Sequence, residues 1–186
     1  MNKSGMSIVS CNSKYNMFGR FTKKSYKSML LFYSGRPVNG SYTKPINSNK
    51  LVDVRDMNGN TYLPLASYQR QQVLCRSLIE MGANINAKNH SDNTPLILAC
   101  RNGDHDIARM LIRKGADTNM QDDEGWTALM WAAERGHHDI CELLVEAGAK
   151  SELVNSVGQN AIMIAIVAGY EGIARELLAS LCSKSH

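Results

Sequence analysis

The amino-acid sequence predicts an all-α protein, a solenoid of four helix–turn–helix units that follows a basic N-terminal extension. Three observations lead to this prediction. The same residue types recur every 33 residues from Asp56 onward, with no insertion or deletion between units. Each unit contains two apolar series at helical spacing, separated by a glycine in the last three units. The first 50 residues lie outside the repeat and contain no Asp or Glu.

The first helix of each unit is predicted from a capping residue that precedes an apolar stretch. Thr94 precedes Pro95 in the second unit, and Thr127 and Asn160 take the same place in the next two. A Thr or Asn side chain can accept a hydrogen bond from a free amide of the first helical turn, and Pro at the first position loses none. Small residues then keep the packed face of this helix narrow; they are Ala66, Ala99, Ala132 and Ala165.

The second helix of each unit is predicted from the residues that follow a chain break. Gly103, Gly136 and Gly169 end the first helix, and an apolar series at helical spacing comes after each of them. Gly115 and Gly148 then allow the left-handed conformation that ends a helix. The rest of each unit, about a dozen residues, is predicted to be an extended loop.

These units resemble the ankyrin repeat family. The family's Thr-Pro-Leu-His motif is approached by Asn-Thr-Pro-Leu-Ile-Leu-Ala-Cys at 93–100 and by Gly-Trp-Thr-Ala-Leu-Met-Trp-Ala-Ala at 125–133. Gly-Ala-Asn-Ile-Asn at 82–86 and Gly-Ala-Asp-Thr-Asn at 115–119 are similar to its loop ending. The resemblance covers about residues 53–182. It implies an extension over 1–52 and an ankyrin repeat domain over 53–186, with repeats near 56–88, 89–121, 122–154 and 155–182.

Two departures from the family pattern carry expectations. The motif histidine, which usually bridges neighbouring loops, is absent from every unit, so we expect looser ties between loops; its place is taken by Pro64, Ile97, Met130 and Met163. The fourth unit is apolar nearly all round from 162 to 168, whereas a terminal repeat usually has a polar outer face. Either the segment 179–186 covers it, or it is an exposed contact surface.

The resemblance implies a non-enzymatic protein–protein interaction module: an adaptor, scaffold or inhibitor. Its partner would bind the concave face that the first helices and loop tips form. Mapping the family's contact positions onto this sequence gives the candidate site. The candidate residues are Tyr68, Leu98, Arg101, Asp123, Glu124, Trp126, Trp131, Glu134, Arg135 and Ile164.

The third unit is the expected centre of this site. Trp131, Glu134 and Arg135 stand at i, i+3 and i+4, and so share one helix face. Trp and Arg are frequent hot spots in protein interfaces. The alternative is that Trp131 packs sideways on the next helix as part of the core.

No pattern in the sequence indicates catalysis, a metal or a cofactor. Motifs of nucleophilic, nucleotide-binding and zinc sites are absent, and His137 with Cys141 supplies two metal ligands where a structural site needs four. Five cysteines without paired spacing indicate a reducing, cytoplasmic location. No apolar run approaches the roughly 18 residues that span a bilayer.

Charge divides the chain into two parts. Residues 1–50 contain nine Lys and Arg, and residues 51–186 contain 12 basic and 17 acidic residues, so charges of +9 and −5 give the net +4. The acidic stack is expected to meet a basic or amphipathic protein surface rather than nucleic acid. The extension has three interpretations: a solvated or partly docked segment, a basic contact that tethers the repeats to membrane or nucleic acid, or a mitochondrial transit peptide. A secreted bacterial effector acting on a host protein is a further alternative.

Overall fold

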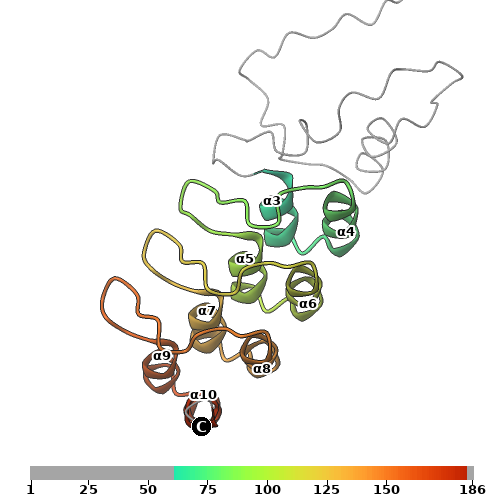
Figure 1. Ribbon diagram of the computed structural model, residues 1–186. Coiled ribbons are helices and arrows are strands. Elements are labelled where there is room, and N and C mark those ends of the chain that lie inside the picture. The colour runs from blue at the N-terminus through green and yellow to red at the C-terminus, as the bar shows by residue number, and fades with distance from the viewer. Residues whose placement is uncertain (1–60, 184–186) are drawn as a thin grey trace, which may run out of the picture. The chain divides into compact units, whose positions relative to one another are not determined.

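The computed structural model describes residues 61–183, in which the chain folds into four pairs of antiparallel helices (Figure 1). The predictions for the extension over 1–52 and for the start of the first repeat lie outside this range. The helices are α3 (Tyr62–Tyr68), α4 (Gln72–Glu80), α5 (Pro95–Arg101), α6 (His105–Arg113), α7 (Ala128–Arg135), α8 (His138–Glu146), α9 (Ala161–Val167) and α10 (Glu171–Ser183). None of these helices has the length and apolar character needed to cross a membrane.

The pairs stack into two rows, as the repeat predicted. The first helices α3, α5, α7 and α9 form one row, and α4, α6, α8 and α10 form the other (Figure 1). The loops between repeats project from the side of the first row (Figure 1). Helices of both rows bury Leu, Ile and Ala side chains between them, so the core runs along the whole stack.

The predicted helix caps are confirmed. The Thr94 and Thr127 hydroxyl groups each accept a hydrogen bond, at 3.2 Å, from the backbone N–H three residues later. Asn160 Oδ1 accepts from the N–H of Met163 at 2.9 Å. Each side chain satisfies one amide that the first helical turn leaves without a partner.

The turn after the first helix contains glycine in the second, third and fourth repeats. Gly103, Gly136 and Gly169 have φ angles of +72°, +73° and +84°, which lie in the left-handed region. In addition, the His137 ring lies against Gly103 and the Tyr170 ring against Gly136, so a β-carbon at either glycine would overlap the ring. Each ring belongs to the residue 34 positions further on, in the next repeat.

The first repeat uses a different pair at the same turn. Arg70 stands in the glycine column with φ +57°, and its Nε lies 3.3 Å from Asp104 Oδ2, again 34 residues further on. An ion pair therefore replaces the ring-on-glycine contact between the first and second repeats.

The Asp or Asn that recurs at the tip of each loop folds the loop on itself. Oδ1 of Asn89, Asp122 and Asn155 accepts hydrogen bonds from the amides two and four residues further on, at 2.8–3.1 Å. A short side chain with an acceptor oxygen is what such a turn requires. The column at Asn89, Asp122 and Asn155 is thus a structural one.

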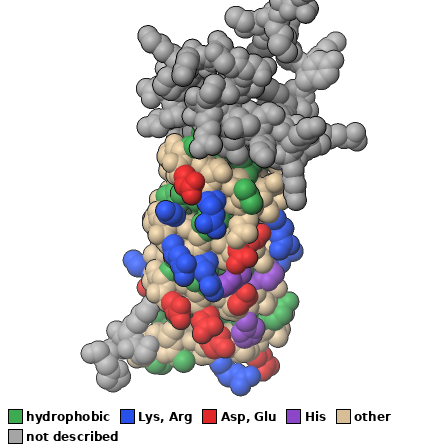
Figure 2. Space-filling view, turned by 90° about the vertical axis from the view of Figure 1, so that its right-hand side faces the viewer, with side chains coloured by type: hydrophobic (Ala, Val, Ile, Leu, Met, Phe, Trp, Pro, Cys, Tyr) green, Lys and Arg blue, Asp and Glu red, His purple; other side chains and the backbone are tan. Residues whose placement is uncertain are grey.

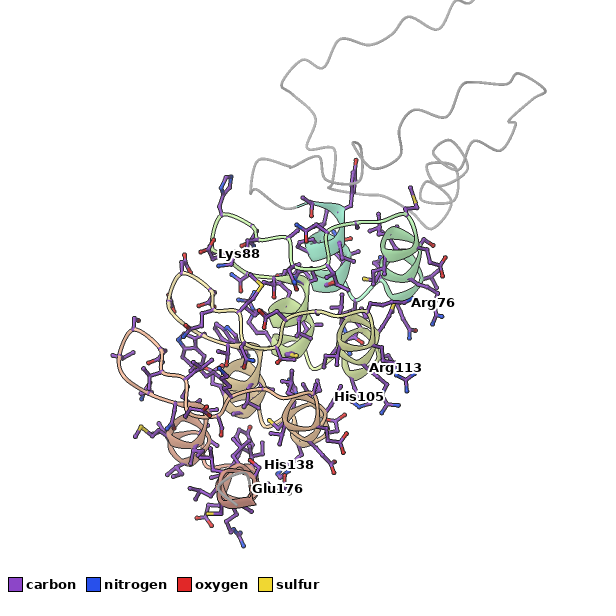
Figure 3. The ribbon with its side chains drawn as sticks, in the orientation of Figure 1. Arg76, Lys88, His105, Arg113, His138 and Glu176 are labelled. Carbon is purple, nitrogen blue, oxygen red and sulfur yellow. The ribbon has the colours of Figure 1, made fainter. Side chains whose placement is uncertain are left out.

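Neighbouring loops are tied without the motif histidine. Asn86 and Asn119 each accept through Oδ1 from a backbone amide of the next loop, at 3.0 and 2.8 Å. Lys88 Nζ donates to the Gln121 carbonyl at 3.1 Å and also pairs with Asp92 (Figure 3). Other polar groups therefore bridge the loops in these repeats, and whether the ties are looser, as expected from the missing histidine, stays a prediction.

Candidate functional site

Two tryptophan rings and an arginine form a continuous stack across the second and third repeats. The Trp126 and Trp131 rings lie 4.5 Å apart between centroids, at an interplanar angle of 32°. The Arg101 guanidinium lies 5.1 Å from the centroid of Trp131, a distance at which a cation is attracted to the ring. Trp126 precedes α7, Trp131 lies within α7, and Arg101 ends α5, so the stack joins two repeats. We call Arg101, Trp126 and Trp131 the aromatic platform.

A buried carboxylate holds the platform in place. Asp122 Oδ2 accepts a hydrogen bond from the indole Nε1 of Trp131 at 3.0 Å, while Oδ1 accepts from the amides of Glu124 and Trp126. Only 8% of Asp122 is exposed. Because both of its oxygens are used, one residue fixes the loop tip and the orientation of the Trp131 ring together.

A groove of about 540 Å³ lies beside the platform, between the third and fourth repeats. Trp126 lines it on the side of the platform, and α9 supplies an apolar side. At its edge the Arg135 Nε lies 3.0 Å from Glu134 Oε2. The lining residues are Trp126, Glu134, Arg135, Gln159, Ile164, Val167 and Ala168.

Comparison with protein families identifies the fold. The family described as ankyrin repeats (3 copies) matches residues 39–122 and 96–185. The chain belongs to the ankyrin repeat family. The match begins at residue 39, earlier than the boundary near residue 53 that the repeat pattern indicates. Ankyrin repeats generally serve as protein–protein interaction modules. A search of curated proteins found no match.

The ankyrin stack brings most of the predicted third-repeat residues to one place. Glu134 and Arg135 line the groove with Trp126. Trp131 is half-buried, and it packs on Trp126 and Arg101 rather than being enclosed by the next helix. Asp123 and Glu124 are exposed at the loop tip. One backbone hydrogen bond ties Asp123 to the preceding loop, and another ties Glu124 to the following loop. Tyr68 is exposed on α3, two repeats before the groove.

Leu98, one of the predicted contact residues, is buried and does not line the groove. Leu98 and Ile164 occupy the same repeat position as Trp131, and each is only 4% exposed. Trp131 and Leu65, at the same position in the third and first repeats, are half-buried. Ile164 nevertheless lines the groove, because the groove is cut between the repeats at that point.

Asp122 was not among the predicted site residues. The sequence did contain a signal for Asp122. The equivalent residues of the second and fourth repeats, Asn89 and Asn155, are amides, whereas the repeat with the two tryptophans has a carboxylate at this position. A carboxylate accepts hydrogen bonds at both oxygens, which an amide cannot do.

Two histidines and the buried cysteines of the described repeats have structural surroundings. His137 packs on Gly103, and His138 Nδ1 lies 3.5 Å from Glu176 Oε2 on the neighbouring helix α10 (Figure 3). Burial raises the pKa of the Cys141 thiol to about 12, so this thiol stays protonated and unreactive at neutral pH. Among residues 61–183, no group of three or more His, Cys, Asp or Glu side chains is arranged to hold a metal.

Charges are separated on the outer row of helices. Basic side chains gather over the earlier repeats and acidic ones over the later repeats (Figure 2), and Arg76 and Arg113 lie on the α4 and α6 side of the stack (Figure 3). Exposed basic residues of the earlier repeats are Arg76, Arg109, Arg113 and Lys114, and exposed acidic residues on α8 are Asp139, Glu142 and Glu146; Glu80, Asp106 and Arg175 are exposed exceptions to this pattern. The acidic character of the stack is thus concentrated in its later repeats, which also contain the groove.

Proposed function

We propose that this ankyrin stack is a non-enzymatic binding module that holds a segment of a partner protein in the groove between the third and fourth repeats. The observation that carries the proposal is the groove itself, lined by Trp126 and by an apolar part of α9. Its volume of about 540 Å³ falls in the range of ligand-binding clefts. A cleft of this size accommodates one or two large side chains of a peptide.

The aromatic platform favours binding because it is held rigid before any partner arrives. Asp122 fixes Trp131, and Trp131 packs between Trp126 and Arg101. A side chain that is already ordered loses little conformational entropy when a partner covers it. Trp and Arg are also the residue types that most often dominate interface energy.

The charges around the groove favour a basic or amphipathic partner segment. Asp123 and Glu124 are exposed at the loop tip that leads into Trp126, and Glu134 lies at the groove edge. Arg135 is the basic group of the lining, and Glu134 offsets its charge at 3.0 Å. We therefore expect an apolar anchor residue flanked by Lys or Arg, with association that weakens as salt increases.

Peptide display against the full chain tests this proposal. We expect enrichment of peptides with Leu, Ile or Phe next to Lys or Arg. Because both tryptophans of the chain belong to the platform, binding of an enriched peptide should change the intrinsic fluorescence. Trp126→Ala and the double variant Trp131→Ala/Arg135→Ala should each weaken binding by about tenfold or more.

Val157→Ala is the matched control, since Val157 is 75% exposed on the next loop tip and does not line the groove. It should bind like the wild type. Circular dichroism must show that each variant remains folded. Folded Trp126→Ala or Trp131→Ala/Arg135→Ala protein with wild-type affinity for the enriched peptides would refute the groove as the binding site.

A second function is favoured by the charge of the extension. Residues 1–50 contain nine Lys and Arg and no acidic residue, so they can bind an anionic surface while the repeats hold a partner. Co-sedimentation of the full chain with phosphatidylserine vesicles, and separately with duplex DNA, distinguishes the two surfaces. Lack of salt-sensitive binding to either would exclude this tethering role.

We further propose a reducing, cytoplasmic location, which the unpaired thiols of Cys75, Cys100 and Cys141 support.

A further inference from the structure

The Arg101 guanidinium carries a charge that no carboxylate offsets by direct contact within the described part of the chain. It lies over the face of the Trp131 ring, 5.1 Å from the centroid. Its side chain takes part in no ion pair or hydrogen bond with the described residues, whereas Arg70 and Arg135 each contact a carboxylate. Arg101 is half-buried, so one side of it faces solvent.

The acid on the same ring leaves Arg101 available. Asp122 contacts Trp131 through the indole N–H, and both of its oxygens already accept hydrogen bonds. The guanidinium has five N–H donors in a planar fork, and this geometry matches a carboxylate. Its stacking on Trp131 holds the fork in one orientation, which lowers the entropy lost when a carboxylate binds.

A chain of contacts connects Arg101 to the groove on one side and to the first repeat on the other. Toward the groove, Trp131 packs on Trp126, which is one of the lining residues. Toward the first repeat, Asn102 Nδ2 donates a hydrogen bond to the Tyr68 carbonyl at 2.9 Å and so ties the ends of α5 and α3. The Tyr68 side chain is 54% exposed. One surface therefore continues from the groove, past Arg101, to Tyr68.

The repeat position of Arg101 faces solvent in all four repeats. Tyr68, Arg101, Glu134 and Val167 are equivalent residues at the carboxyl ends of α3, α5, α7 and α9, helices that follow one another in one row (Figure 1), and each is exposed or half-buried. Glu134 and Val167 also line the groove, so the groove belongs to this row. Neighbouring helices lie about 8–10 Å apart, and an extended chain rises about 3.3 Å per residue. A segment that lies along the row therefore meets a new repeat about every third residue.

We propose that the bound segment continues from the groove along this row and places an Asp or Glu side chain on Arg101. The inference rests on the proposed function and adds a register to it. Arg101 lies one and a half repeats from the groove, about 15 Å, so the acid stands about four residues from the apolar anchor. About three residues further, an apolar side chain covers Tyr68. Basic residues of the segment stay near the anchor, beside Glu134.

Peptide display with randomised segments of about 12 residues, which span three repeats when extended, tests this register. The full chain and its Arg101→Glu variant are screened in parallel, and the enriched peptides are aligned on their apolar anchor. We expect Asp or Glu about four residues from the anchor with the wild type, and Lys or Arg there with Arg101→Glu. Arg113→Glu is the matched control, because it makes the same charge change on α6 in the other row (Figure 3), and it should select the wild-type pattern.

A double-mutant cycle measures the contact with one enriched peptide. Arg101→Gln, which removes the charge and keeps a side chain of similar length, and replacement of the peptide acid by Gln should each weaken binding about fivefold. The two changes together should cost no more than either alone. Tyr68→Ala should weaken binding of the whole peptide and leave a peptide truncated after its acid unaffected.

The outcomes separate this inference from the proposed function. An apolar anchor that needs Trp126 but has no acid at a fixed spacing overturns the inference alone. An acid preference that persists unchanged in folded Arg101→Glu, as judged by circular dichroism, overturns it as well. Absence of any apolar anchor that depends on Trp126 overturns both.

Discussion

The Asp122 carboxylate provides the sharpest test of how the platform is built. In Asp122→Asn, the amide oxygen can still accept from the Glu124 and Trp126 amides, since Asn89 and Asn155 do the same in their own loops. The amide nitrogen, however, then faces the indole N–H of Trp131, and both are donors. The substitution therefore removes one hydrogen bond and leaves the loop turn in place.

The expected cost follows from the bond that is lost. A hydrogen bond to a charged acceptor contributes about 1.5–3 kcal/mol. Trp131 is half-buried, so water can partly satisfy its indole N–H in the variant. We therefore expect Asp122→Asn to lower the free energy of unfolding by about 1.5 kcal/mol, the lower end of that range. Asn155→Asp, the reciprocal change in the fourth repeat, has no indole to lose, but it removes the weak hydrogen bond that Asn155 Nδ2 donates to Gln159 Oε1 at a position only 4% exposed, and it should cost about 1 kcal/mol.

Urea denaturation followed by circular dichroism measures both values, and a double-mutant cycle isolates the bond. Trp131→Phe removes the indole N–H and keeps an aromatic ring. Once it is present, Asp122→Asn should cost little more, which gives a coupling energy of about 1.5 kcal/mol. Fully additive effects, or a stability of Asp122→Asn equal to that of the wild type, would show that the carboxylate does not hold the ring.

Two further predictions concern the core of the stack. Gly169→Ala should lower the free energy of unfolding by about 1–2 kcal/mol, because φ is +84° and no atom lies near the new β-carbon. Gly136→Ala, at the equivalent turn of the third repeat, should cost about 1–3 kcal/mol more, because its β-carbon overlaps the Tyr170 ring. Equal costs in thermal denaturation would contradict the role of that ring. Burial raises the pKa of Cys75 to about 11 and that of Cys141 to about 12, from an ordinary 9.0. In the unfolded chain these thiols lose their protons at a lower pH than in the folded chain. The free energy of unfolding should therefore fall as pH rises above about 9, by about 1.4 kcal/mol per thiol at about pH 10. Cys75→Ala/Cys141→Ala, which copies the alanines in this column of the other repeats, should flatten that fall in urea titrations; an unchanged slope would refute it.

Much of the fold could be predicted because each repeat position performs a local task. Thr94, Thr127 and Asn160 cap their helices through atoms three residues away, and the glycines that follow each first helix adopt backbone angles that other residues avoid. Such requirements act within one turn of chain, so spacing reveals them. The contact residues were harder to predict, because exposure depends on neighbours. Leu98 and Trp131 hold equivalent positions, yet Leu98 is only 4% exposed whereas Trp131 is half-buried.

The sequence by itself determined the all-α solenoid, the phase of its repeats, the helix caps and the absence of any catalytic pattern, because a period of 33 residues expresses local geometry repeated without interruption. Only the tertiary structure decided that Asp122 orients Trp131 and that a groove opens between the third and fourth repeats. These features arise from contacts between repeats. A residue in a repeat column has the same local environment in every unit, but its exposure is set by what packs next to it.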